Sequence, residues 1–162
     1  MKNTLFAIAG TALFITVLGV YLKYSEEGTI NLKDYVYTKS IVTISDQVVN
    51  VELANSNTKI SKGLSGRNSL EEGNGMLFVF DKNDTKPSFW MKGMKFSIDI
   101  IWIKDEIIVK IDKNVPPADK NTPDNEIPRY NPEGYIDYVL EVNAGFSDKY
   151  NIKENDRIEI NI

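Results

Sequence analysis

The chain has 162 residues, with 19 Lys and Arg against 23 Asp and Glu and a net charge of −4. It contains neither Cys nor His, which excludes disulfides, thiolate metal sites, a cysteine nucleophile and an imidazole base. An acidic chain of this kind is not expected to bind nucleic acid, and any chemistry must use carboxylates, Lys, Arg or backbone groups.

Residues 1–23 are predicted to form a membrane anchor. Residues 4–22 carry no charged side chain, and Lys2 and Lys23 flank them; about 20 apolar residues are enough to span a bilayer. A cleaved signal peptide, the alternative, has a shorter apolar region followed by small residues, whereas this run ends in Tyr21 and Leu22. We expect an uncleaved single-pass helix in the cell membrane, with the C-terminal domain extracytoplasmic by the positive-inside bias.

Residues 24–40 are polar and lack periodicity, so we expect a tether there and a folded domain at 41–162. At its start, residues 41–44 and 48–53 read as a hairpin around Ser45-Asp46-Gln47. A helix is predicted from about Thr58 to Gly66, capped by Asn55 or Ser56.

The rest of the domain is rich in short apolar runs bounded by turn residues. Strands are predicted at 76–80, 88–91, 98–103, 107–111, 138–142 and 157–160, with a turn at 81–84 and a short helix at 145–150. This pattern indicates an α+β, mostly β fold: an antiparallel sheet or partly closed barrel with two short helices, preceded by one transmembrane helix.

Residues 113–134 form a proline-rich segment in which we expect neither strand nor helix. Its prolines are Pro116, Pro117, Pro123, Pro128 and Pro132. Its acidic residues Asp119, Asp124 and Glu126 raise the question of calcium, but their spacing does not fit an EF-hand loop. We therefore expect a rigid connection between two strands, and we predict no metal site and no cofactor.

Two short motifs invite a functional interpretation. Residues 62–67, Lys-Gly-Leu-Ser-Gly-Arg, could bind phosphate, but the glycine spacing fits no phosphate-binding fingerprint and favours helix termination with a capping Arg. Residues 89–96 would place Trp90, Lys92 and Met94 on one side of a strand. That side would either pack in the core or present an aromatic surface to sugars, ring compounds or peptide side chains.

Asp99 lies in an apolar run, 98–103, where an unpaired charge is costly. One interpretation is an internal ion pair with Arg67 or Lys92 that sets the strand register. In another, Arg67, Lys92, Asp99 and Glu141 converge beside Trp90 in a polar pocket. Asp99 and Glu141 could then act as a pair of carboxylates in general acid–base catalysis, as in glycosidases.

Several motifs occur in an order that is similar to a known family. They are residues 63–67 (GLSGR), 75–80 (GMLFVF), 89–92 (FWMK), 99–100 (DI), 115–117 (VPP) and 138–146 (YVLEVNAGF). Together they resemble the domain of unknown function 192 family across nearly all of residues 47–160. The chain departs from the usual family pattern at Gly93, Ser97 and Ala118, where Asn, Pro and Cys are common.

The resemblance implies a small, mostly β prokaryotic protein behind a signal peptide or membrane anchor, and it implies no activity. Our main hypothesis is an extracytoplasmic binding module for a small ligand, glycan or peptide, with ligand-binding residues Arg67, Trp90, Lys92, Asp99 and Glu141. The alternatives are a carboxylate-dependent hydrolase at the same site, or a scaffold for other envelope proteins.

Overall fold

The computed structural model describes residues 36–80 and 85–162. Residues 36–162 fall into one compact unit. The predicted anchor, most of the predicted tether and the predicted turn at 81–84 lie outside the described residues. Among the helices of the described part, none has the length and apolar character needed to cross a bilayer.

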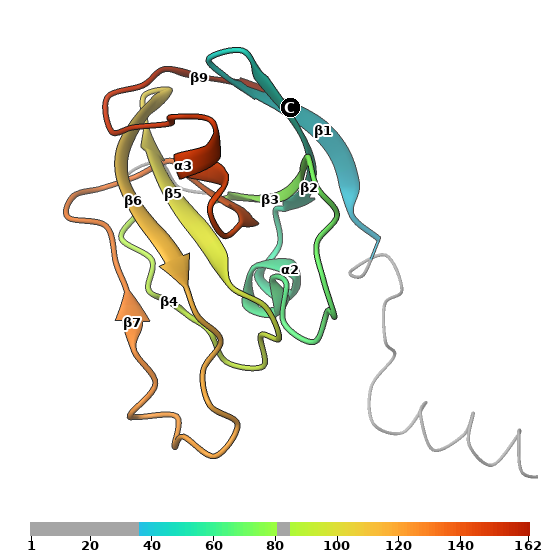
Figure 1. The fold of residues 1–162 in the computed structure, drawn as a ribbon, viewed down its shortest axis with the longest axis vertical. Helices are drawn as coiled ribbons and strands as arrows, with labels where there is room; N and C mark the ends of the chain where they lie inside the picture. Colours follow the sequence, from blue (N-terminus) through green and yellow to red (C-terminus); the bar gives the residue numbers. More distant parts are fainter. Residues whose placement is uncertain (1–35, 81–84) are drawn as a thin grey trace, which may run out of the picture. The chain divides into compact units, whose positions relative to one another are not determined.

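A seven-stranded sheet organises the domain (Figure 1). Its strands are β1 (Thr38–Ile44), β2 (Gln47–Ala54), β3 (Asn74–Val79), β5 (Ile98–Lys104), β6 (Ile107–Val115), β8 (Tyr138–Asn143) and β9 (Ile158–Asn161). They are ordered β6-β5-β8-β3-β2-β1-β9. Neighbours run antiparallel except for β2 and β3, which are parallel because helix α2 (Asn57–Lys62) and a loop carry the chain back between them.

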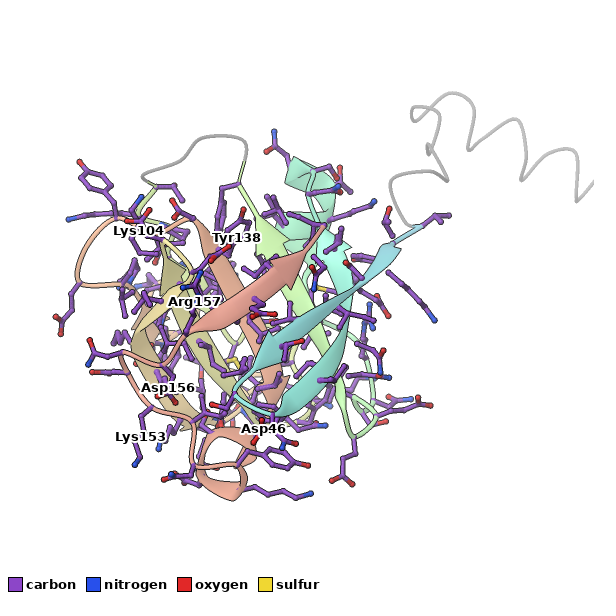
Figure 2. All side chains as sticks on the ribbon, turned by 90° about the horizontal axis from the view of Figure 1, so that it is seen from above. Asp46, Lys104, Tyr138, Lys153, Asp156 and Arg157 are labelled. Carbon is purple, nitrogen blue, oxygen red and sulfur yellow. The ribbon has the colours of Figure 1, made fainter. Side chains whose placement is uncertain are left out.

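The sheet curls until its two ends meet. Ile107 of β6 bridges Arg157, and the Ile108 amide donates to the Asp156 carbonyl at 3.0 Å. Figure 2 shows Asp156 and Arg157 where the segment entering β9 approaches β5 and β6. The predicted mostly β fold with a partly closed barrel is therefore confirmed for the described residues.

Alternation along the strands produces two apolar clusters on opposite faces of the sheet. The first includes Ile108 of β6 and Ile158 of β9, so it fills the inside of the curl. Phe146 and Tyr150, from and beside the short helix α3 (Phe146–Lys149), pack against it. The second cluster lies on the other face and contains Trp102, Phe78 and Met76.

A covering layer lies on the second cluster. It contains α2 and a two-stranded sheet of β4 (Phe89–Trp90) and β7 (Arg129–Tyr130), which Figure 1 shows side by side. The prediction that 113–134 contains no strand is wrong: β6 continues to Val115, and β7 forms inside the segment. A two-residue strand has no recognisable periodicity of its own, and its partner is distant in the sequence.

The predicted helix near residue 58 forms but ends earlier than expected. Ser56 is its N-cap, with the Lys59 amide donating to Ser56 Oγ at 3.4 Å. Gly63 is its C-cap because this residue takes φ of +48°, outside the helical region, and its amide donates to the Lys59 carbonyl at 2.8 Å. The chain from Gly63 to Arg67 is therefore a loop on the covered face of the sheet.

Candidate functional site

A pocket of about 320 Å³ opens between the sheet and its covering layer. The end of α2 and the loop after it form one side, and β4 with the following turn forms another. Residues from five parts of the chain line it: Ile60, Ser61, Lys62, Gly63, Leu64, Ser65, Phe78, Pro87, Ser88, Phe89, Trp90, Lys92, Met94, Arg129 and Glu141. The pocket thus combines apolar walls with three cations and one carboxyl group.

Glu141 is the acidic residue of this lining. It lies on β8 between Met76 of β3 and Ile100 of β5, on the face of the second cluster. Its side chain is buried, and its Oε2 has no hydrogen-bond partner among the described residues. Burial raises the pKa of the Glu141 carboxyl to about 8, although the charge of Arg67 acts in the opposite direction. Glu141 is therefore mainly neutral at pH 7 and can both donate and accept a hydrogen bond.

Trp90 forms the aromatic wall, and cations already lie on its ring. The Arg129 guanidinium is 3.8 Å from the ring centroid, because β4 and β7 pair Trp90 directly with Arg129. Lys92 Nζ is 5.2 Å from the centroid and also pairs with Asp124. The expected combination of an aromatic surface and a cation is present, with Arg129 as the nearer cation.

The turn after β4 locks the pocket rim to the loop after α2. Gly93 has φ of +71°, and its carbonyl accepts a hydrogen bond from the Gly66 amide at 2.9 Å. A Cβ atom at Gly93 would lie 2.5 Å from Ser65 Oγ. Because the chain turns here, the predicted strand alternation through Met94 is wrong, and Met91 and Met94 are both buried.

Arg67, a predicted ligand-binding residue, does not line the pocket. Its guanidinium makes two hydrogen bonds to Glu52, at 3.0 and 2.5 Å, and lies 5.4 Å from the centroid of the Tyr37 ring. The hydrogen bonds from Arg67 hold the pKa of Glu52 below its usual value. The predicted role of Arg67 as a cap of α2 is therefore wrong, and its charge acts to lower the pKa of Glu141.

Asp99 is also outside the pocket. Its carboxyl group accepts backbone hydrogen bonds from Asn114 at 2.8 Å, Gly145 at 3.1 Å and Ser147 at 2.8 Å. The expected ion pair with Arg67 or Lys92 is wrong, because these amides satisfy the buried carboxyl instead. Asp99 thus links the end of β6 to the start of α3.

The strand register separates Asp99 from Glu141. Asp99 pairs with Val142 and Ile100 pairs with Glu141, so the two acidic side chains point to opposite faces of the sheet. The structure therefore brings together Trp90, Lys92 and Glu141, and it does not bring Asp99 or Arg67 into the same pocket. The two-carboxylate arrangement that a glycosidase-type mechanism requires is not formed by Asp99 and Glu141.

Sequence reasoning missed Arg129, Lys62 and Ser65 as pocket residues. Arg129 lies in the proline-rich segment, and only the pairing of β7 with β4 places it on Trp90. Lys62 and Ser65 belong to the motif at 62–67, but only the tertiary structure shows that Ser65 packs closely against Gly93, in the turn after β4. In the part of the chain that the structure describes, no group of three or more acidic residues is placed to hold a metal ion.

Comparisons with known proteins agree with the fold. A crystal structure of a protein of unknown function from Novosphingobium aromaticivorans is similar, with a TM-score of 0.66 and 28% identity over 75% of this chain and 84% of that one. A second, from Sinorhizobium meliloti and described provisionally as a transcription regulator, has a TM-score of 0.67 and 26% identity over 76% of this chain and 95% of that one. No curated protein matches the chain. The model of the family DUF192, described as an uncharacterized ACR, matches residues 40–160, and the chain therefore belongs to the DUF192 family.

Proposed function

We propose that this protein is a binding module that holds a small ligand in the pocket beside Glu141. The observation that carries the proposal is the buried Glu141 carboxyl, which lines the pocket and has an oxygen to which no residue in 36–80 or 85–162 makes a hydrogen bond. Leaving such a group unsatisfied costs about 1–3 kcal/mol. A ligand that hydrogen-bonds Glu141 recovers this free energy, whereas an apolar residue at this position would have avoided the cost.

The shape of the site supports a small molecule as the ligand. A volume of about 320 Å³ lies at the lower end of ligand pockets. The hydrogen bond from Gly66 to Gly93 and the close approach of Gly93 to Ser65 hold two sides of the rim together, so the pocket is formed before a ligand enters. A preformed site of this size suits a monosaccharide or an amino acid better than a long peptide.

A binding experiment on the full chain in mild detergent tests the proposal. Amide chemical shifts are followed during titration with a chemically diverse set of neutral, anionic and cationic small molecules. We expect one class to shift the Ser65 and Lys92 amides and the Trp90 indole together.

Two matched variants control the experiment. Ser88→Phe places a ring at an exposed position of the pocket lining, whereas Ser69→Phe places the same ring at an exposed position outside it. We expect only Ser88→Phe to abolish binding. A folded protein that responds to no compound would refute the proposal and favour a scaffold for other envelope proteins.

We also propose that residues 1–23 anchor the domain in the cell membrane, with residues 41–162 on the outer side. The proposal is supported by the uncharged run at 4–22 and the flanking Lys2 and Lys23. Alkaline phosphatase fused after residue 40 is active only when exported. An inactive fusion that is stably produced would overturn the orientation.

A further inference from the structure

We propose that the ligand is a small hydroxylated anion, a carboxylate or phosphate, whose charged group binds Arg129 and Lys62 and whose hydroxyl group binds Glu141. This inference rests on the proposed function, because it names the chemical class of molecule that the same pocket takes.

The pocket lining has more cationic than acidic side chains. The lining contains the cations Lys62, Lys92 and Arg129 and one acidic residue, Glu141. Lys92 is balanced by Asp124, whereas Lys62 and Arg129 form no ion pair with a described residue. Because Glu141 is mainly neutral at pH 7, the pocket lining, as far as the described residues show it, carries more positive than negative charge. This local excess stands out in a chain whose net charge is −4, and it attracts anions and repels cations.

The contact between Arg129 and Trp90 orients the Arg129 guanidinium. Its guanidinium lies against the Trp90 ring at 3.8 Å, and stacking of this kind restrains the plane of the guanidinium. One face of the group is then occupied, and no described residue accepts a hydrogen bond from the N–H groups at its edge. A planar edge of this kind matches the two oxygens of a carboxylate or phosphate. A neutral ligand would leave this prepared donor set unused.

Glu141 supplies the second contact. A neutral carboxyl group offers one donor and one acceptor, and a hydroxyl group is complementary to both. An ammonium group would also satisfy Oε2, but the positive charges of Lys62 and Arg129 in the lining oppose it. A hydroxyl on an anionic molecule meets both conditions.

Paired probes, one with and one without an anionic group, test the first part of the inference on the full chain in mild detergent. We would titrate glucuronate against glucose, and glycerol 3-phosphate against glycerol, at pH 7. We expect each anion to bind about tenfold or more tightly than its neutral partner. Arg129→Gln should weaken binding of the anions by about tenfold or more. Arg157→Gln should leave the affinity for the anions unchanged, because Arg157 pairs with Glu106 outside the pocket.

The role of Glu141 is tested by comparing glycerol 3-phosphate, which carries hydroxyl groups on a carbon chain, with inorganic phosphate, which has no such chain. Glu141→Leu replaces the buried carboxyl with an apolar group of similar size. This variant should bind glycerol 3-phosphate more weakly and should bind inorganic phosphate as tightly as the wild type does. Equal weakening of both probes would overturn the role of Glu141. A cooperative urea-unfolding transition checks that each variant is folded.

The outcomes separate this inference from the proposed function. If neutral molecules bind the pocket as tightly as anions, or if Arg129→Gln has no effect, the inference fails and the binding function stands. The inference also fails if a compound from the diverse set binds in the pocket and neither glucuronate nor glycerol 3-phosphate does. If no compound of any charge binds, the proposed function itself fails.

Discussion

Glu141→Gln should make the protein more stable at neutral pH, by an amount that depends on pH. In the native state burial raises the pKa of this carboxyl from the ordinary 4.5 to about 8. The unfolded chain exposes the same group, which then titrates at its ordinary value. Between these two pH values the native protein keeps a proton that the unfolded chain has lost, so wild-type stability falls as pH rises.

The size of the effect follows from the two pKa values. Below pH 4.5 both states of the wild type are protonated and the group causes no pH dependence. Above this value each pH unit lowers the free energy of unfolding by about 1.4 kcal/mol, until the native carboxyl ionises near pH 8. The loss is about 3 kcal/mol at pH 7. Gln has similar size and does not titrate, so the variant does not show this loss.

Urea unfolding of both proteins between pH 4.5 and 8, followed by tryptophan fluorescence, measures the difference. All other titrating groups are shared, so their contributions cancel when the two curves are subtracted. The difference should grow steadily with pH in favour of the variant. Parallel pH profiles for the two proteins would refute the reasoning, as would a Glu141 carboxyl resonance that titrates near 4.5.

Three further substitutions test the contacts around the site, each measured by urea unfolding. Asp99→Ala should lower the free energy of unfolding by about 3 kcal/mol or more, because three backbone amides lose their acceptor, and Asp99→Asn should lower it less; equal losses would contradict this role. Gly93→Ala should cost about 1–3 kcal/mol, because of its positive φ and the nearby Ser65, whereas Gly134→Ala, which meets no atom within 4 Å, should cost little. Lys92→Gln should change stability by less than about 0.5 kcal/mol, since its ion pair is exposed; a large loss would show that the pair is structural.

The local features of the fold were predictable because they depend on neighbouring residues. Apolar runs bounded by turn residues indicated the principal strands, including the pair β5 and β6 around residues 104–106. A hairpin around Ser45 and Asp46 and a helix N-cap at Ser56 also formed as expected. The order of short motifs was enough to suggest the family, which the family comparison confirms.

Three of the five predicted ligand-binding residues line the pocket, and local sequence was enough to single them out. Trp90 and Lys92 are close in sequence, and any turn or strand there would keep them near each other. Glu141 attracted notice because a carboxyl within an apolar strand needs an explanation. What the sequence could not provide was the partner of each polar group.

Only the tertiary structure decided those partners, because they depend on register and on contacts between distant segments. The pairing of Ile100 with Glu141 turns Asp99 to the other face of the sheet, where backbone amides bind it. The pairing of β4 with β7 brings Arg129 onto Trp90. A shift of one residue in either register would reverse these orientations while leaving every local pattern intact. The sequence by itself thus determined the elements and the family, and the strand pairing determined which residues share the pocket.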